Sequence, residues 1–164
     1  MHILRSASFS RCGSYRYSLT RKWEAGTGRC VFIGLNPSTA NGSVDDPTIR
    51  RCMGFTQTWG FNELVMINLF AYKTPHPELL KQANDPEGPN NRRVVRKHCL
   101  CAQRIVLAWG VHGTFNNQAK RFSKLFVNQD VHCFGITKSG QPLHPLYQRA
   151  DAQLVPYTEF ESDH

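Results

Sequence analysis

The sequence predicts an α/β protein, a three-layer α/β/α sandwich around a central, mostly parallel four-stranded sheet, with a hairpin at the N-terminus. Four short runs are apolar throughout, which is typical of strands buried on both faces, and they span residues 30–35, 63–69, 104–109 and 131–136. Helical patterns or long connections separate these runs, which favours parallel strands joined by crossovers. With 164 residues, of which 40% are hydrophobic, the chain fits a single domain over residues 1–164.

The N-terminal hairpin is predicted from a change of pattern. The segment "SYRYSLTRKW" (14–23) alternates with a period of two, and "GTG" separates it from the apolar run 30–35. We therefore expect these two segments to pair as the hairpin. The aromatic and basic side chains of 14–23 either contact single-stranded nucleic acid or form one packed and one solvated face, and we favour the second interpretation.

Three helices are expected between the strands. Asp46 is suited to cap a helix with Pro47 at its first position, and Gly60 ends it. The segments "NRRVVRKHCLCA" (91–102) and "TFNNQAKRFSKLFV" (114–127) predict the other two. The proline-rich stretch 71–91 predicts at most a short helix.

Composition and charge restrict the class of partner. The chain carries 20 Lys and Arg against 12 acidic residues, a formal net charge of +8, which favours a polyanion such as nucleic acid. No apolar run approaches the roughly 18 to 20 residues that span a bilayer, and the N-terminus lacks the apolar stretch of a signal peptide. We expect a cytoplasmic protein that does not bind membranes. Among six cysteines only Cys99 and Cys101 are close in sequence, so free thiols and no metal site are predicted.

Polar residues follow each of the four predicted core strands. They are Asn36 after the first, Asn68 in the second, Trp109-Gly110 after the third, and the segment 137–147, which includes His144, after the fourth. Taken singly, an Asn-Pro turn, a strand-end Asn or a His before Pro has an ordinary structural explanation. Because the carboxyl ends of parallel strands meet at one edge, their joint occurrence predicts a ligand site there.

The motifs at these strand ends resemble those of a known superfamily. "VFIGLNPS", "VMINLF", "IVLAWG" and "GQPLHPL" occur in the order found in the uracil-DNA glycosylase superfamily. With "NPSTAN", "DDPT", "NLFA" and "HPL", the chain is more similar still to a bacterial and phage family of domains of unknown function, DUF1643. The resemblance covers most of residues 14–149.

The superfamily resemblance implies roles for several side chains. Asn36 would orient a water molecule towards the sugar C1′, and His144 would donate a hydrogen bond to the leaving base. Asn68 would read the base edge with its amide. For stacking on the base the candidates are Phe55, Phe70 and Tyr72, although core packing is the alternative for the two phenylalanines.

A second set of residues concerns the water and the DNA. Asp46 is explained as a helix cap, whereas Asp45 has no capping role and is the alternative candidate for the catalytic base. For DNA contacts we expect Lys73 and Lys138 to bind phosphates and Leu146 or Tyr147 to act as a wedge. Ser38, in the loop after the first strand, and Ser139, beside Lys138, are expected to contact DNA as well.

The function predicted from the sequence is hydrolysis of the N-glycosidic bond of a damaged or modified base in single- or double-stranded DNA. We expect a monomer that uses no cofactor. Two alternatives stay open: a same-fold enzyme or binder of a free nucleotide or nucleoside, and a catalytically silent nucleic-acid-binding module.

Overall fold

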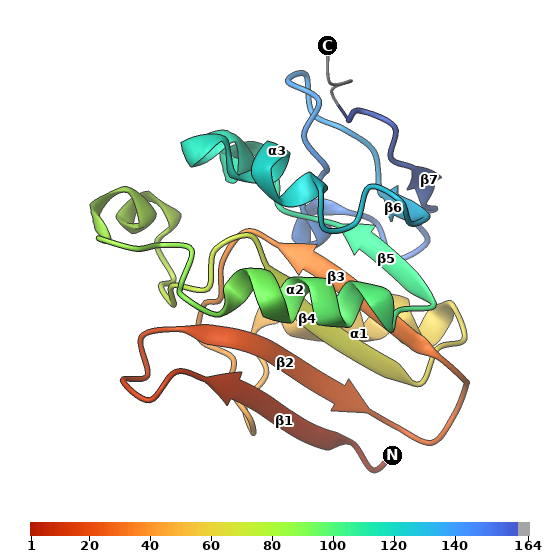
Figure 1. The fold of residues 1–164 in the computed structure, drawn as a ribbon. Coiled ribbons are helices and arrows are strands. Elements are labelled where there is room, and N and C mark those ends of the chain that lie inside the picture. The colour runs from red at the N-terminus through yellow and green to blue at the C-terminus, as the bar shows by residue number, and fades with distance from the viewer. Residues whose placement is uncertain (161–164) are drawn as a thin grey trace.

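A mixed sheet of seven strands runs through the molecule in the order β1-β2-β4-β3-β5-β6-β7 (Figure 1). The computed structural model describes residues 1–160. The strands are β1 (Leu4–Phe9), β2 (Arg16–Lys22), β3 (Arg29–Gly34), β4 (Glu63–Asn68), β5 (Arg104–Leu107), β6 (Val131–Cys133) and β7 (Val155–Pro156). The predicted α/β class is confirmed, and the sheet is larger than the four strands expected.

The middle of the sheet is parallel and its edges are antiparallel. β3 pairs in parallel with β4 and with β5, and β5 pairs in parallel with β6. β1, β2 and β7 join the edges in the antiparallel sense. In the register between β3 and β4, Gly34 lies beside Asn68. The polar residues that follow these two strands are therefore brought to the same end of the sheet.

The predicted hairpin between 14–23 and 30–35 is wrong. β2 pairs with β1 and with β4, whereas β3 lies between β4 and β5. The physical reason is burial: residues 30–34 of β3 are all buried, so the strand needs neighbours and covering layers on all sides and takes a central position. The hairpin partner of β2 is β1, an edge strand whose side chains are mostly exposed and whose sequence carries little hydrophobic signal.

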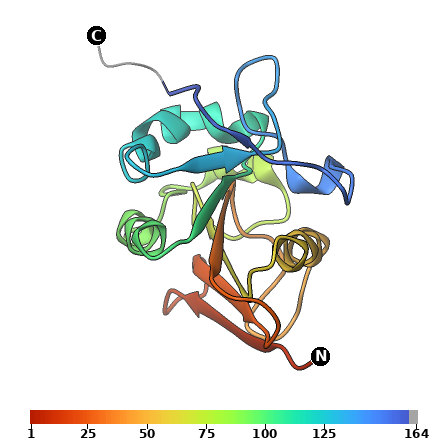
Figure 2. The ribbon, with the colours of Figure 1, turned by 90° about the vertical axis from the view of Figure 1, so that its right-hand side faces the viewer.

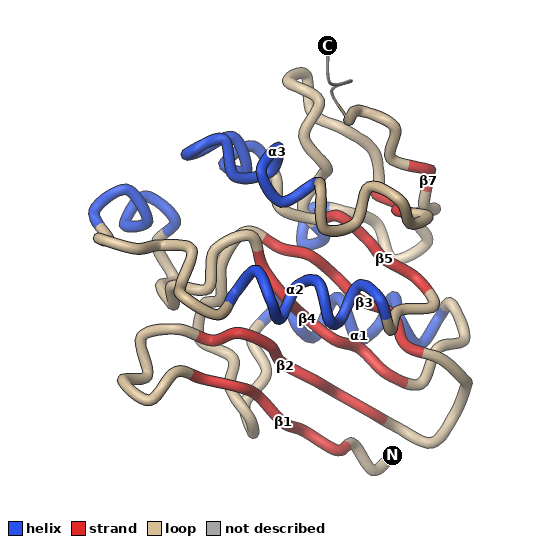
Figure 3. The backbone as a smooth tube through the Cα atoms, viewed as in Figure 1, coloured by secondary structure: helices blue, strands red, loops and turns tan. Residues whose placement is uncertain are grey.

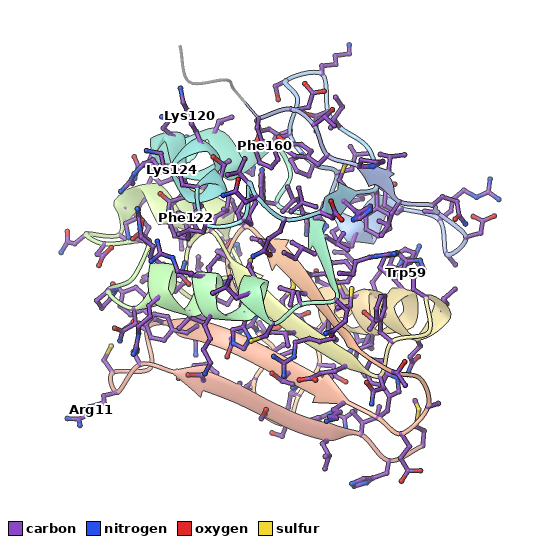
Figure 4. All side chains as sticks on the ribbon, turned by 45° about the vertical axis from the view of Figure 1, so that its right-hand side comes forward. Arg11, Trp59, Lys120, Phe122, Lys124 and Phe160 are labelled. Atoms are coloured by element: carbon purple, nitrogen blue, oxygen red, sulfur yellow. The ribbon has the colours of Figure 1, made fainter. Side chains whose placement is uncertain are left out.

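Helices cover both faces of the sheet (Figures 2 and 3). On one face α2 (Asn91–Leu100) and α3 (Gln118–Ser123) pack against side chains such as Val31 and Ile33. On the other, α1 (Pro47–Thr58) packs against Phe32 and Met66. The labelled side chains of Trp59 and Phe122 lie on opposite sides of the sheet in Figure 4, next to α1 and α3 respectively.

The start of α1 agrees with its sequence signals. Asp46 is the N-cap, and its Oδ1 accepts a hydrogen bond of 2.9 Å from the Ile49 amide, with Pro47 at the first helical position. This cap anchors the loop 36–45 at the carboxyl end of β3. The loop is thus held between the strand and the helix, which leaves little freedom for the residues it carries.

The helix expected over 114–127 is shorter than predicted. The chain instead forms the 3₁₀ segment η2 (Val111–Asn117) and then the short α3. Asn116 and Asn117 have φ of 53° and 56°, in the left-handed region that Asn tolerates, and this interrupts the helix. Two other 3₁₀ segments are η1 (Pro77–Gln82) and η3 (Pro145–Tyr147). Within residues 1–160 no helix is long and apolar enough to cross a membrane.

Candidate functional site

A cavity of about 590 Å³ opens at the carboxyl end of β3 and β4. Its walls come from the ends of these strands, the loop before α1, the start of η2 and the segment up to η3. Six of the residues predicted for the site line it: Asn36, Ser38, Asn68, His144, Leu146 and Tyr147. Segments far apart in the sequence therefore meet at one place, as expected for the strand ends of a parallel sheet.

The Asn36 amide is fixed by the backbone around it. Its Nδ2 donates to the carbonyl oxygens of Pro37 at 3.0 Å and Thr74 at 2.9 Å, with a longer contact to Tyr72. Carbonyl oxygens only accept, so these partners identify which amide atom is the nitrogen. The acceptor Oδ1 is left without a donor from any described residue, in a side chain that lines the cavity. Asn36 thus offers an oriented hydrogen-bond acceptor.

Asn68 is the most unusual polar residue of the site. Its side chain is only 2% exposed, and neither Nδ2 nor Oδ1 has a hydrogen-bond partner within the described chain. Such buried unpaired groups cost about 1–3 kcal/mol each. A Cβ built on Gly34 would lie 2.7 Å from Oδ1, so a glycine is needed beside this amide. An unpaired amide at a cavity wall indicates a ligand that supplies the missing partners.

His144 is held as a neutral hydrogen-bond donor. Its Nδ1 accepts a hydrogen bond from the Leu146 amide at 3.2 Å, which puts the ring proton on Nε2. Burial lowers the pKa of His144 below its ordinary value of 6.5, and the carboxylate of Asp46 opposes this only in part. At neutral pH the ring therefore donates through Nε2 without carrying a charge.

Two charged residues at the cavity were not predicted as site residues. Arg16 is 2% exposed and Asp46 is 8% exposed, and both line the cavity. Asp46 was identified from the sequence only as a helix cap. Arg16 was assigned to an alternating strand, but the pairing of β1 with β2 shifts between Ser8 and Phe9, at the partner of Arg16. No sequence signal marks such a bulge, so the position of Arg16 could not be inferred from the pattern.

Asp45, the alternative candidate for the base, does not line the cavity. It forms ion pairs with Arg21 at 2.7 Å and with Arg5 at 3.2 Å. Burial alone would raise the pKa of Asp45, but the hydrogen bonds from the two arginines outweigh it and the pKa is lowered. Asp45 ties the loop before α1 to β1 and β2.

The aromatic residues predicted to stack on a ligand are not in the cavity lining. Phe55 packs between Trp59 and Phe134, with ring centroids 5.5 and 4.7 Å away. Phe70 is fully buried beside Phe115. The ring of Tyr72 meets Tyr15 edge-on, and its carbonyl contacts Asn36.

The predicted DNA-binding residues divide between the mouth of the cavity and the surface around it. Leu146 and Tyr147 line the cavity and are 40% and 85% exposed. Lys73, Lys138 and Ser139 are exposed but lie outside the lining. The Ser139 hydroxyl is 3.0 Å from that of Thr137, which does line the cavity, so the 137–140 turn borders the site.

The arrangement offers hydrogen-bonding side chains to a polar ligand. Asn36, Asn68 and His144 offer acceptors and donors, and residues 1–160 contain no cluster of three His, Cys, Asp or Glu side chains that could hold a metal. The cavity volume is in the range of small-molecule sites. Its lining includes the buried polar side chains of Arg16, Asp46 and Asn68, and buried polar groups of this kind are a usual basis of ligand selectivity.

Comparison with known proteins gives one match. A search of curated proteins and a search of solved structures each returned no match. A family model described as a protein of unknown function, DUF1643, matches residues 16–146. This range includes β2 to the start of η3 and almost all of the cavity lining. The chain therefore belongs to the DUF1643 family.

Proposed function

We propose that the protein is a DNA glycosylase that hydrolyses the N-glycosidic bond of a damaged or modified base. The observation that carries the proposal is the buried Asn68 amide, whose two polar atoms have no partner within residues 1–160 and which lines the same cavity as Asn36 and His144. A base turned out of the DNA stack would enter the cavity and meet this amide with its hydrogen-bonding edge. An amide supplies both a donor and an acceptor, so it discriminates between bases.

Asn36 would hold the attacking water. An amide is a weak base, so its Oδ1 would orient the water rather than deprotonate it. The orientation is rigid because Nδ2 is bound to backbone carbonyls and Pro37 restricts the chain. The water oxygen bonds to C1′ as the glycosidic bond breaks, the bonding electron pair leaves with the base, and the protons are redistributed through solvent.

His144 would stabilise the departing base. Cleavage passes through an oxocarbenium-like transition state, in which negative charge grows on the base. A neutral imidazole with its proton on Nε2 can donate to a base oxygen as that charge develops. The lowered pKa of His144 supports this role, since it keeps the ring neutral at neutral pH, while the Leu146 amide selects the tautomer with the proton on Nε2.

The surface around the cavity supports a DNA substrate. Leu146 and Tyr147 project at the mouth and are suited to fill the space left by an extruded base. Lys73 and Lys138 lie in the bordering loops, where they would bind phosphates. We infer further that the parallel strands, with helices on both faces, form a three-layer core like that of the uracil-DNA glycosylase superfamily, which the ordered motifs resemble.

A second candidate function is hydrolysis or binding of a free nucleotide or nucleoside. It is favoured by one observation: Arg16 lies in the cavity lining, whereas Lys73 and Lys138 do not. A free ligand would need neither a wedge nor a phosphate track. Measurement of binding to duplex DNA, single-stranded DNA and mononucleotides separates the two candidates.

The experiment that tests the glycosylase is a panel of oligonucleotides, each carrying one modified base, with the released base measured by chromatography. On the substrate that the protein cleaves, we expect Asn36→Ala to abolish release while DNA affinity changes little. A water displaced by about 1 Å already loses on the order of a hundredfold in rate. Asn128→Ala removes an exposed amide and is the matched control. Release at the parental rate by Asn36→Ala would refute the mechanism.

A further inference from the structure

β2 carries two buried arginines with opposite surroundings. Arg21 is 0% exposed and Arg16 is 2% exposed. Arg21 is fully bonded: Nε donates to Asp45 at 2.7 Å, Nη1 donates to two carbonyls, and Nη2 donates to the carbonyls of Asn41 at 2.6 Å and Val44 at 3.2 Å. It therefore has both a counter-ion and a partner for every nitrogen.

Arg16 lacks this support. Among residues 1–160, only its Nη1 has an acceptor, the Ala40 carbonyl at 3.0 Å, and its buried Nε has no partner there. Nη2 likewise donates to none of them. Within the same residues no carboxylate forms an ion pair with Arg16. Asp46 is near enough to interact electrostatically, but its two oxygens accept from the amides of Ile49 and Ala40.

The charge on Arg16 is nevertheless retained. Burial lowers the pKa of Arg16 to about 10, with Asp46 opposing the shift, so the guanidinium stays protonated at neutral pH. A buried cation that forms no direct ion pair destabilises a fold, and folded proteins keep such groups mainly where they act. Arg16 lines the cavity together with Asn68, whose amide also has no partner in the part of the chain that the structure describes.

We propose that Arg16 binds a negatively charged oxygen of the ligand inside the cavity. The inference rests on the proposed function in placing the ligand there, but it does not require that the ligand be cleaved. A guanidinium has donors only, so its partner must be an acceptor, and an anionic oxygen makes the strongest and most specific bond. Arg16 would supply the single strong positive charge that His144, which is neutral, does not.

Two ligands carry this chemistry. One is a base with an exocyclic oxygen, on which negative charge develops as the base departs. The other is a nucleotide, whose phosphate carries the charge from the start. In either case, an exocyclic amino group facing Arg16 would bring two hydrogen-bond donors together, which is unfavourable. Arg16 would therefore also select against a ligand that presents an amino group at that edge.

The first measurement is stability, with Arg21 as the matched control. We expect Arg16→Met, which keeps the apolar stem, to unfold at a temperature equal to or above that of the parent, because an unpaired buried charge is removed. Arg21→Met breaks a buried ion pair and should unfold about 10 °C lower. If Arg16→Met unfolds as readily as Arg21→Met, or does not fold, Arg16 is a structural residue and the proposal is overturned.

The second measurement is direct calorimetric binding of inorganic phosphate, uracil, hypoxanthine, and the 5′-monophosphates of deoxyuridine and deoxyinosine. We expect at least one probe to bind the parent and to bind Arg16→Met on the order of tenfold to a hundredfold more weakly, with part of the loss restored in Arg16→Lys. Binding of free bases identifies the base oxygen as the partner, and binding of phosphate or of the monophosphates alone identifies the phosphate.

The outcomes separate the two proposals. No binding of any probe to the parent, or equal binding by Arg16→Met, overturns the role of Arg16. Probe binding that depends on Arg16 without base release from any oligonucleotide would overturn the glycosylase and keep the anion site. If base release is unchanged in Arg16→Met, the role of Arg16 is overturned and the glycosylase is kept.

Discussion

The two faces of the sheet differ sharply at the end of β4. On the face of α2 and α3, the Asn91 amide donates to the carbonyls of Asn68 at 2.9 Å and Leu69 at 3.1 Å. Gln118 donates to the same Leu69 carbonyl and to Glu87. On the face of α1, the Asn68 side chain has no partner among the described residues. The end of β4 is therefore hydrogen-bonded on the face of α2 and α3, the bonded face, and unpaired within the described chain on the face of α1, the open face.

The bonded side extends into a network of charges. Glu87 pairs with Arg92 at 3.2 Å and with Arg121 at 3.7 Å, which links α2, α3 and the loop before α2. The open side has Asn68 and Arg16, each with buried polar atoms that have no partner among the described residues. Hydrogen bonds on the face of α2 and α3 stabilise the end of β4. This support holds in place the polar groups on the face of α1 that have no partner among the described residues.

Among the variants that compare the two faces, the largest expected effect concerns His144, on the open face. His144→Ala removes the donor to the leaving base and should slow base release by about 10²–10³-fold, the usual loss for one such donor. His132, on β6, is also partly buried with a lowered pKa but does not line the cavity, so His132→Ala is the control. Single-turnover rates on the substrate oligonucleotide give the comparison. Equal losses in both variants would mean that the position of His144 at the cavity is not what base release depends on.

The second prediction compares Asn91 with Asn68 in stability. Asn91→Ala leaves the buried Asn68 carbonyl without that donor and should lower the free energy of unfolding by about 2 kcal/mol. Asn68→Ala removes an amide that has no partner in the described chain, so it should leave this free energy unchanged or raise it. Urea denaturation of both variants measures the difference. A loss for Asn68→Ala as large as that for Asn91→Ala would contradict the contrast between the faces.

Much of the site could be predicted because it depends on strand order. Continuous apolar runs identified β3 and β4, and the strand-end rule then placed Asn36, Asn68 and His144 at one edge. The cap of α1 by Asp46 followed from a side-chain preference that acts within four residues. These predictions rest on local patterns and on a topological rule, both of which are carried by the sequence.

The missed features depend on tertiary interactions that a pattern does not contain. The sequence showed no local role for Asp45, because its partners Arg21 and Arg5 lie on strands that are distant in sequence. Phe55 and Phe70 could point to the cavity or to the core, and the packing of α1 and η2 decides this. Arg16 enters the cavity beside an irregularity in the β1–β2 register. Only the assembled tertiary structure fixes these positions.

A third prediction concerns pH. Since the pKa of His144 is lowered by burial, the ring stays neutral until the pH falls below its ordinary value of 6.5. Protonation would place a hydrogen on Nδ1, which then cannot accept from the Leu146 amide. Base release should therefore be constant from pH 6.5 upwards and decline in more acid solution. The pH–rate profile measures this, and His132→Ala should keep the same profile.

The pKa shift of His144 also predicts how acid affects stability. Its folded pKa lies below the unfolded one, so the unfolded chain binds the proton more readily and stability decreases as the pH falls below 6.5. His98 and His132 have pKa values lowered by burial and add to the same trend. Denaturation at several pH values separates this loss of fold from the loss of rate. A rate that declines only together with the folded fraction would remove the catalytic role from His144.

The smallest expected effect tests which face meets DNA. Lys73 lies with its ammonium 5.4 Å from the Phe9 ring, and Lys138 is exposed in the turn that borders the cavity. If both bind phosphates, Lys73→Ala combined with Lys138→Ala should reduce the slope of log affinity against log salt by about 0.9 for each phosphate of duplex DNA that is no longer neutralised.

Arg93→Ala combined with Arg96→Ala removes two exposed charges from α2, on the opposite face, and is the matched control. Fluorescence anisotropy over a salt series gives both slopes. If the slope flattens only in the α2 variant, the DNA binds on the face of α2 and α3, away from the Asn68 side chain. The cavity would then serve a small ligand.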